Sequence, residues 1–171
     1  MSKFNKLYET DNLYYTNINA DLINDYLTMV NDPEVQKFIY KEPKSFDYDG
    51  EVDWIKDRKE KGEPFFSIIE KSTDEFVGNM EYLNRGSYYE IGICLTPNKQ
   101  DRHYGYEAIN FIIDYGYNEM NLKEIRLGVF SHNKRAIHLY EKVGFVEESR
   151  IKNSHMVDGK YVDDIEMLLK R

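Results

Sequence analysis

Residues 88–117 read YYEIGICLTPNKQDRHYGYEAINFIIDYGY and are followed at residues 124–130 by EIRLGVF. The first eight residues and the last seven are rich in β-branched and aromatic types, which favour strands. Between them, apolar residues at helical spacing predict a helix over about residues 104–120, with a core-facing stripe of Ala108, Ile109, Ile112, Ile113 and Tyr117. Because a strand, helix, strand succession needs a crossover connection, we predict that the two strands are parallel.

The segments on either side of this unit extend the sheet. FFSIIEK, FVGNMEYL and YYEIGICL are separated by STDE and NRGS, which predicts three consecutive antiparallel strands. NKRAIHLYEKV, ended by Gly144, predicts a helix, and FVEESRIK with YVDDIEMLL predicts a final hairpin that turns at Asp158 and Gly159. Towards the N-terminus we expect a strand at residues 13–18, a helix capped by Asn19 or Asp21, a short helix after Pro33, and a helix at 47–61 ended by Gly62.

These elements predict an α/β fold of the α+β kind. Its central sheet is mixed and mostly antiparallel, with one parallel strand pair and helices on both faces. The chain has 171 residues and contains no repeat, low-complexity tract or Pro/Gly/Ser linker. We therefore expect a single domain over residues 1–171, large enough to bury its own core.

Composition excludes several classes of function. A net charge of -8 argues against a nucleic-acid-binding surface and would attract a cationic substrate. Cys94 is the single cysteine, so we expect no intramolecular disulfide and no cysteine-histidine metal site. The start, MSKFNKLYETDN, lacks an apolar signal-like stretch, and the apolar run at residues 65–69 is too short to span a bilayer. A cytoplasmic protein without a membrane partner is the simplest interpretation.

The stretch QDRHYGYEA, residues 100–108, leads into the long helix. A pyrophosphate needs several convergent N–H donors, and a loop entering a helix N-terminus supplies them with a favourable dipole. Gly105 permits close approach of a ligand to the backbone. The expected donors are the backbone N–H groups of Arg102, Tyr104, Gly105 and Tyr106. Because one glycine before a helix also suits a structural turn, the stretch alone is weak evidence.

A phosphate ligand on an acidic protein also needs local positive charge. The cationic side chains that flank the two motifs are Lys99, Arg102, Lys134 and Arg135. Ordinary solvated surface charges explain these residues equally well, so both interpretations stay open.

A second motif, SHNKRAIHLYEKVGF, occupies residues 131–145. Asn133 lies at or just before a helix start, where an N-cap role alone explains an asparagine. Tyr140 follows seven residues later, two turns along the same helical face. A tyrosine there is either a core residue or a group that faces a ligand, and spacing does not choose between the two.

Together the two motifs resemble the acetyl-coenzyme-A-binding region of the GNAT superfamily of N-acetyltransferases. The family pattern Q-x-x-G-x-G/A, continued by x-E-A, is matched by Gln100, Gly105, Glu107 and Ala108. The pattern A-x-x-L-Y-x-x-x-G-F is matched by Ala136, Leu139, Tyr140, Gly144 and Phe145. The order of elements is similar to the branch that contains ribosomal-protein N-terminal acetyltransferases and spermidine acetyltransferases.

The resemblance implies an acetyl-CoA-dependent N-acetyltransferase in which an amine attacks the acetyl thioester directly and no metal takes part. It implies that Tyr140 is the general acid for the leaving thiolate and that Asn133 contacts the pantetheine arm or orients the end of the site. It also implies that the two parallel strands splay apart, so that a backbone N–H among Ile93, Cys94 and Leu95 faces the developing oxyanion. The residues implied to bind the cofactor are these three strand residues with Gln100, Arg102, His103, Tyr104, Gly105, Tyr106, Asn133, Arg135 and Tyr140.

His103 departs from the family pattern, which has glycine at this position. If the backbone there needs a positive φ, histidine is strained. Its ring can instead lie against a phosphate as an imidazolium, or it can narrow the groove and weaken cofactor binding. These three alternatives remain open.

The general base and the acceptor are harder to predict. Glu90 and Glu81 are candidate bases on neighbouring strands, although partly exposed sheet residues are the simpler interpretation of both. Cys94 suggests an acyl-cysteine intermediate, but a lone cysteine in an apolar strand is more often a small buried residue. We expect residues 22–48 and 152–160 to shape the acceptor site for a small amine or polyamine, an amino sugar or a peptide N-terminus. The alternative is a non-catalytic CoA-binding or regulatory module, and the final hairpin leaves a homodimer open.

Overall fold

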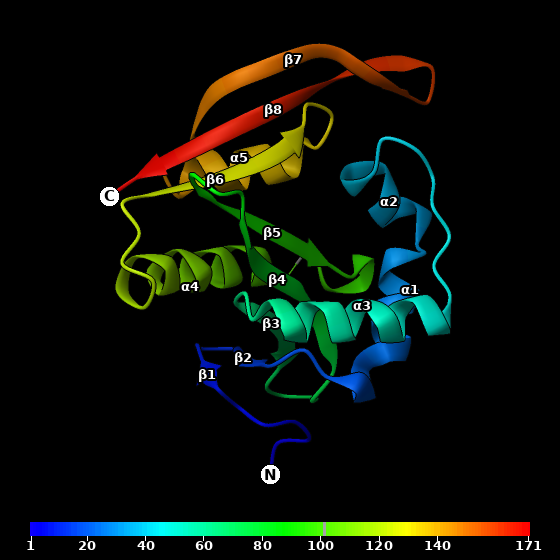
Figure 1. Cartoon of the computed structure of the whole chain (residues 1–171), viewed down its shortest axis with the longest axis vertical. Coiled ribbons are helices and arrows are strands. Elements are labelled where there is room, and N and C mark those ends of the chain that lie inside the picture. Colours follow the sequence, from blue (N-terminus) through cyan, green and yellow to red (C-terminus); the bar gives the residue numbers. More distant parts are fainter. Residues whose placement is uncertain (101) are drawn as a thin grey trace.

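The computed structural model describes residues 1–100 and 102–171. Within them, eight strands form one sheet in the order β1-β2-β3-β4-β5-β6-β8-β7 (Figure 1). The strands are β1 (Tyr8–Glu9), β2 (Leu13–Thr16), β3 (Phe65–Glu70), β4 (Phe76–Asn84), β5 (Tyr89–Leu95), β6 (Glu124–Phe130), β7 (Val146–Val157) and β8 (Lys160–Lys170). The helices are α1 (Ile23–Val30), α2 (Pro33–Ile39), α3 (Tyr48–Lys61), α4 (Tyr104–Asn118) and α5 (Lys134–Lys142), with 3-10 turns η1 (Ala20–Leu22) and η2 (Pro97–Lys99).

The N-terminal elements begin and end at their capping residues. Asn19 caps η1 by accepting a hydrogen bond from the backbone of Asp21, and α2 begins at Pro33 as predicted. Gly62 ends α3 with a φ of 65°, a conformation that glycine adopts without strain. The predicted first strand is shorter than expected and forms β2, which pairs with the unpredicted strand β1. The predicted helices are confirmed.

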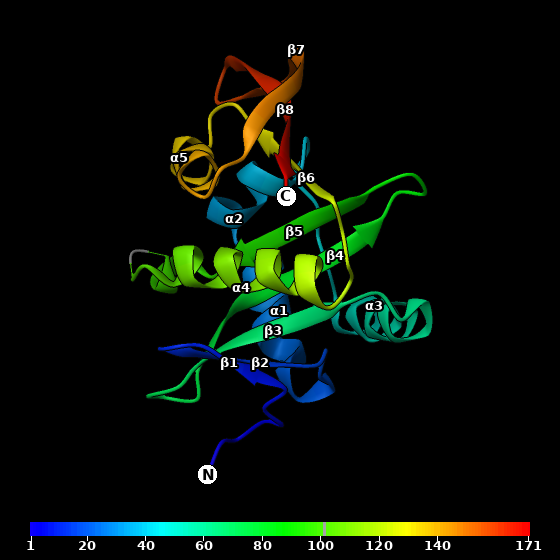
Figure 2. The same ribbon diagram turned by 90° about the vertical axis from the view of Figure 1, so that its left-hand side faces the viewer.

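The middle of the sheet confirms the predicted parallel pair. Strands β2 to β5 are antiparallel neighbours, whereas β5 and β6 run parallel and are connected through α4 (Figure 2). The pairing between β5 and β6 consists of one register position, Glu90 opposite Arg126, near the start of both strands. β6 turns its other edge to β8 and pairs with it along seven residues. The two strands therefore meet at one end and are unpaired towards their C-terminal ends.

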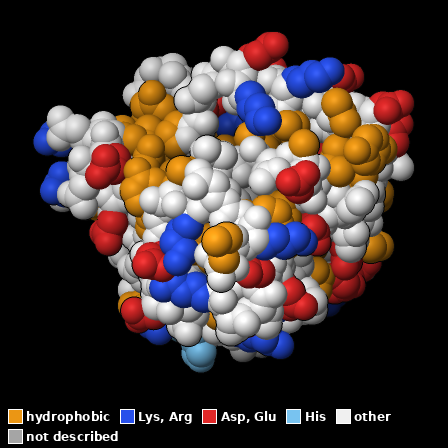
Figure 3. All heavy atoms as spheres, turned by 90° about the horizontal axis from the view of Figure 1, so that it is seen from below, with side chains coloured by type: hydrophobic (Ala, Val, Ile, Leu, Met, Phe, Trp, Pro, Cys, Tyr) orange, Lys and Arg blue, Asp and Glu red, His pale blue; other side chains and the backbone are white. Residues whose placement is uncertain are grey.

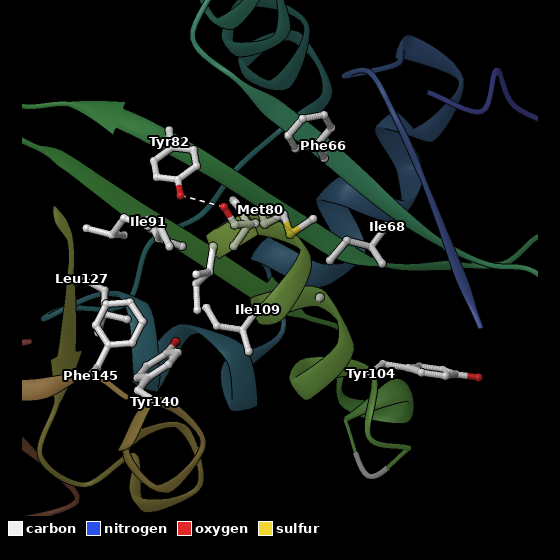
Figure 4. Packing of buried hydrophobic residues seen from close by; sticks show 14 of the residues in the cluster. Phe66, Ile68, Met80, Tyr82, Ile91, Tyr104, Ile109, Leu127, Tyr140 and Phe145 are labelled. Atoms are coloured by element: carbon white, nitrogen blue, oxygen red, sulfur yellow. Dashed lines mark hydrogen bonds between the residues drawn. The ribbon is translucent and has the colours of Figure 1, made fainter. Parts of the chain in front are cut away.

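Two hydrophobic cores lie on opposite faces of the sheet, as expected for side chains that alternate along strands. One lies under α4 and α5 and contains Ile109, Tyr140 and Phe145 (Figure 4). The other lies under α1, α2 and α3. In the first core, Gly116 has no room for a side chain, because an added Cβ would lie 2.0 Å from the Tyr82 hydroxyl. That hydroxyl donates a 2.7 Å hydrogen bond to the backbone carbonyl of Ile112.

The final hairpin is longer than the sequence predicted. The pattern FVEESRIK ends at residue 152, but β7 continues to Val157 because it pairs with β8 across register shifts that absorb extra residues. β8 lies between β6 and β7, so β7 is the edge of the sheet. Figure 1 shows this hairpin at the end of the molecule opposite the N-terminus.

The surface carries both charge signs side by side. On the face seen in Figure 3, Lys and Arg side chains lie interspersed with Asp and Glu, and apolar side chains gather in separate patches. In the part of the chain that the structure describes, no helix combines the length and apolar character needed to cross a membrane.

Candidate active site

The open end of the β5–β6 pair presents backbone N–H groups without a strand partner. Thr96 donates its backbone N–H to the Val77 carbonyl of β4 at 2.8 Å. Because successive amides of a strand point to opposite edges, the N–H groups of Leu95 and Ile93 point towards β6. In the described register, β6 does not pair with β5 at these residues. Two of the three predicted strand residues therefore aim N–H donors into the splay, whereas the N–H of Cys94 points to β4.

Gln100 joins the two walls of this splay. Its Nε2 donates to the Leu95 carbonyl at 3.0 Å, and its Oε1 accepts from Arg135 Nη1 at 3.1 Å. Leu95 ends β5 and Arg135 lies in the first turn of α5, so the glutamine spans both motifs. The structure thus brings together three residues that the sequence predicted from segments some 35 positions apart in the chain.

The helix N-terminus has the geometry of an anion-binding site. Within the described residues, the N–H groups of Tyr104, Gly105 and Tyr106 have no acceptor, as expected for a first helical turn. His103 precedes them, exposed, with φ 61° and ψ 9°, the left-handed region that strains a non-glycine residue. Its side chain makes no capping hydrogen bond. Gly105 packs tightly, since an added Cβ would lie 3.3 Å from Leu139 Cδ2 of α5.

A buried carboxylate, that of Glu70, binds side chains on both sides of the loop between η2 and α4. Glu70, at the end of β3, accepts hydrogen bonds from Lys99 Nζ and from the Tyr104 hydroxyl, and a 2.9 Å bond from Thr73 Oγ1. These contacts lower the pKa of Glu70 to about 2, with the Lys99 hydrogen bond as the largest cause and the Tyr104 hydroxyl next. The side chains of Lys99 and Tyr104 therefore point into the protein.

One of the four flanking cations faces into the protein. Lys99, for which phosphate contact and ordinary surface charge were both open, is 4% exposed and binds Glu70 and Glu75, the latter at 2.6 Å. Burial removes Lys99 from solvent, and the two carboxylates satisfy its charge. Arg102 differs, because its side chain is 55% exposed and lies 3.5 Å from Glu70. Its guanidinium can reach a ligand in front of the helix.

A cation that the sequence did not single out lies near the same helix end. Lys142 Nζ of α5 lies 4.5 Å from the ring centroid of Tyr106, an exposed residue in the first turn of α4. This cation-π contact places positive charge between the two helices. The signal in the sequence was weak, because a lysine in the last turn of a helix is common for reasons of the helix dipole.

Tyr140 lies in α5, near Cys94 of β5. The residue is 7% exposed and packs against Phe145, with ring centroids 6.0 Å apart (Figure 4). Among described residues its hydroxyl has no hydrogen-bond partner, and it is not one of the fully enclosed polar atoms. Burial, and secondarily the nearby Cys94, raises the pKa of Tyr140, so the phenol is protonated at neutral pH. Two surface hollows of the protein lie elsewhere and are not lined by Tyr140.

Asn133 and Cys94 take the simpler of their predicted roles in the structure. Asn133 caps α5 by accepting a hydrogen bond from the Ala136 backbone at 3.3 Å. Burial raises the pKa of the Cys94 thiol to about 12. A thiol with that pKa supplies almost no thiolate at neutral pH, so Cys94 is a poor nucleophile. Contact of either residue with a cofactor stays a prediction.

The two candidate bases already have cationic partners. Arg58 of α3 lies 2.7 Å from Glu81 and 2.8 Å from Glu63. Burial raises the pKa of Glu81, and the Arg58 charge opposes this shift. Glu90 binds Arg85 at 3.1 Å and lies at the closed end of the β5–β6 pair. A base role for either residue stays a prediction, and Glu81 has the pKa direction that suits it.

Comparison with known proteins agrees with this geometry. Residues 12–146 match a family profile described as an acetyltransferase (GNAT) domain. The chain belongs to the GNAT acetyltransferase family. A spermidine N(1)-acetyltransferase of Vibrio cholerae is 30% identical to this GNAT protein over 139 residues, 78% of each chain. A ribosomal protein uS5-alanine N-acetyltransferase of Escherichia coli is 25% identical over 105 residues, 59% of this chain and 54% of that one.

The fold of this GNAT protein is also found in solved structures. A crystal structure of spermidine N-acetyltransferase from Vibrio cholerae in complex with CoA and spermine has a TM-score of 0.84 at 23% identity, covering 94% of this chain and 96% of that one. A GNAT-family acetyltransferase from Bacillus anthracis has a TM-score of 0.80 at 21% identity, covering 95% and 96%. These likenesses confirm the predicted fold.

Proposed function

We propose that the open end of the β5–β6 pair is the acetyl-transfer site of an acetyl-CoA-dependent N-acetyltransferase, and that Tyr140 is its general acid. The observation that carries this proposal is the free Tyr140 hydroxyl at a splay into which the N–H groups of Ile93 and Leu95 point. A protonated phenol and unpartnered N–H donors supply the two groups that acyl transfer from a thioester needs.

Each residue has one step in this reaction. The amine nitrogen attacks the acetyl carbon, which forms the C–N bond and moves the carbonyl electrons onto oxygen. The N–H groups of Ile93 and Leu95 stabilise that oxygen. As the C–S bond breaks, Tyr140 gives its proton to the departing sulfur. The proton that the amine loses leaves through water or through Glu81, whose raised pKa makes it the better of the two predicted bases.

The described residues fit the anionic end of acetyl-CoA. The N-terminus of α4 offers the N–H groups of Tyr104, Gly105 and Tyr106, and the exposed Arg102 guanidinium lies beside them. Arg135 is held by Gln100 next to the end of β5, and Lys142 adds charge beside Tyr106. These cations supply the local positive charge that a pyrophosphate needs on an otherwise acidic protein.

A primary amine is the proposed acceptor. The net charge of -8 draws cations to the protein, and the Vibrio cholerae relative named above is a spermidine acetyltransferase. A small amine or polyamine is therefore favoured over an amino sugar or a peptide N-terminus. We further propose that residues 1–171 act as one cytoplasmic domain without nucleic-acid or membrane partners.

The test combines binding and turnover. We expect calorimetry to show acetyl-CoA binding, and a thiol-release assay with a panel of amines to show turnover. Tyr140→Phe should lower kcat by roughly 10²-fold or more, since it removes a general acid, while the Kd for acetyl-CoA stays unchanged. Tyr8→Phe is the matched control, because Tyr8 is an exposed tyrosine of β1, away from both motifs. Binding without thiol release from any amine would favour the non-catalytic CoA-binding module instead.

The exposed hairpin also supports a proposed homodimer. β7 is the edge of the sheet, and the hairpin exposes Val146, Ile151, Met156 and Tyr161, each more than half accessible. An edge strand with apolar side chains is suited to pairing with a second copy. Analytical ultracentrifugation of the wild type and of Ile151→Lys tests this: a dimer that the substitution dissociates supports it, and a monomeric wild type contradicts it.

A further inference from the structure

His132 has two ring nitrogens that are enclosed without a partner. The residue follows the C-terminal end of β6, and among the described residues neither Nδ1 nor Nε2 finds a hydrogen-bond partner. Buried polar atoms nearly always have one, so an imidazole enclosed in this way is unusual. The ring packs on Phe38 of α2, with centroids 4.9 Å apart, and on Phe130 of β6 at 6.2 Å. His132 therefore lies in the contact between α2 and the end of β6.

The β6 side of this contact is fixed to the final hairpin. Ser131 donates its backbone N–H to the Asp163 carbonyl of β8 at 2.9 Å, and its Oγ accepts from the Asp163 N–H at 2.8 Å. His155 of β7 also packs on Phe130, with ring centroids 4.5 Å apart. His132 thus belongs to an aromatic cluster that is held in place by the sheet.

The α2 side is held by fewer contacts. Figure 1 shows this short helix beside the end of β6. Of its apolar side chains, Val35 is buried, Phe38 is half-buried and Ile39 is exposed. The ion pair between Lys41 and Asp164, at 3.3 Å, is on the surface and adds little. Because elements with few buried contacts open first, α2 is the side of the contact that can move.

The packed arrangement disfavours a charged His132. Burial lowers the pKa of His132, and the charges of His155 on β7 and Lys37 on α2 act in the same direction. The Lys37 backbone and the carboxylate of Asp158 in the hairpin turn oppose this shift, but no hydrogen bond to the ring is completed. The other neighbours of the ring are aromatic. An imidazolium here would carry two enclosed N–H donors without acceptors, which is costly.

We propose that His132 and α2 form a pH-sensitive contact, in which protonation of His132 releases α2 from the end of β6. Movement of α2 exposes the ring to water, which supplies acceptors for both N–H groups. Above pH 6.5, the ordinary value for histidine, the ring is neutral in both arrangements and the contact is unaffected. Below it the exposed ring takes up a proton more readily than the packed one, so opening becomes more favourable as pH falls.

The size of the effect has an upper limit. At pH 5.5 an exposed ring with the ordinary pKa is protonated about ten to one, so the opening equilibrium rises by at most about tenfold relative to neutral pH. The helix lies within residues 22–48, which we expect to shape the acceptor site. Opening should therefore weaken acceptor binding, a step that rests on the proposed function.

Hydrogen exchange tests the contact without turnover. Protection factors, which remove the intrinsic pH dependence of exchange, are compared at pH 7.5 and 5.5. In the wild type, those of the α2 amides should fall roughly three- to tenfold, and those of Ile109 and Ile112 in α4 should not change. His132→Phe keeps a ring against Phe38 but cannot be protonated, so its α2 protection should not change with pH. The matched control is His138→Phe, at an exposed histidine of α5, which should behave as the wild type.

Two results would overturn the inference. One is α2 protection that falls equally in the wild type and in His132→Phe. The other needs no variant: an NMR titration of the wild type in which the His132 ring has a pKa of 6.5 or above.

The link to the acceptor has its own readout. The ratio of the amine KM in the wild type to that in His132→Phe cancels the ionisation of the amine itself. This ratio should rise about threefold or more between pH 7.5 and 5.5. If no amine is turned over, the proposed function fails, and if the ratio is constant, the link to the acceptor fails. In both cases, α2 protection that falls in the wild type alone still supports the pH-sensitive contact.

Discussion

Glu70 and Glu51 are both about 95% buried, but their surroundings are opposite. Glu70, on the cofactor side, receives hydrogen bonds from Lys99, Tyr104 and Thr73, and its pKa is lowered to about 2. Glu51, in the first turn of α3, has no cation paired with it among the described residues, and burial raises its pKa. The partners of Glu70 are in place without any ligand, whereas Glu51 has no positive charge paired with it among the described residues. Burial therefore costs the Glu51 carboxylate free energy that the contacts of Glu70 offset.

The largest change in stability should come from removing the charge of Glu70. Glu70→Gln leaves Lys99 buried with only Glu75 as an anionic partner, so we expect a loss of about 3 kcal/mol in the free energy of unfolding. The loop should lose its support, and the Kd for acetyl-CoA should rise roughly tenfold. Chemical denaturation and calorimetry measure both quantities. Glu75→Gln is the control, because Glu75 is 62% exposed and should cost under about 1 kcal/mol. Equal effects of the two substitutions would refute a special role for Glu70.

Glu107 offers a second, smaller test on the cofactor side. Its carboxylate accepts hydrogen bonds from the backbone N–H groups of Asn12 at 2.8 Å and Leu13 at 3.1 Å, and from the Thr10 hydroxyl. It therefore ties α4 to the start of β2. Glu107→Gln should cost about 2 kcal/mol in unfolding free energy, since hydrogen bonds to a charged acceptor are lost. A loss below about 0.5 kcal/mol in denaturant titrations would show that the contacts of Glu107 with residues 10–13 contribute little to stability.

The pH dependence of stability should separate the two carboxylates by sign. The Glu70 pKa is lowered, so its stabilisation is present above the unfolded value of 4.5 and is lost as pH falls towards 2. The Glu51 pKa is raised, so its contribution is greatest below 4.5 and is lost as pH rises through the folded value. Relative to wild type, Glu51→Gln should therefore gain stability as pH increases from 4 to 8. Parallel unfolding curves for wild type and variant over this range would contradict the assignment.

His103 should give the smallest effect. Its left-handed backbone is strained, so His103→Gly should stabilise the protein by roughly 0.5–1 kcal/mol, after allowing for the extra entropy of unfolded glycine. Thermal unfolding measures this gain, and His103→Ala, which keeps the strain, is the control. The Kd for acetyl-CoA then separates the open alternatives: tighter binding in His103→Gly marks the ring as an obstruction, and weaker binding marks it as a ligand contact.

Much of the fold was predictable because its signals are local. Helical spacing at Ile109 and Ile112, Pro33 at a helix start and Gly62 at a helix end each act within a few residues of the chain. The parallel β5–β6 pair followed from chain connectivity alone. The extension of β7 to Val157 was missed, because it depends on pairing with β8 and not on a local pattern.

The site was less predictable, since its energetics depend on contacts between distant segments. The spacing of Gln100 and Tyr140 indicated the motif; the structure bonds Gln100 to the end of β5, and the place of Tyr140 at the splay stays a prediction. The inward turn of Lys99 fits neither of the two interpretations left open by the sequence, because the Glu70 that pairs with it lies 29 residues away in sequence. Glu51 was not recognised at all, as a glutamate in the first turn of a helix reads as a favourable dipole contact.

The sequence by itself determined the order of elements, the parallel crossover and the family to which the motifs belong, because periodicity, caps and spacing are written along the chain. Only the tertiary structure decided which charges are satisfied. In the folded protein Glu70 pairs with Lys99 and Glu81 pairs with Arg58, whereas Glu51 is buried with no cationic partner among the described residues. The physical reason is that the free energy of a charged side chain depends on how much hydration it loses on burial and on which partner another element supplies. Neither is set by the residues next to it in sequence.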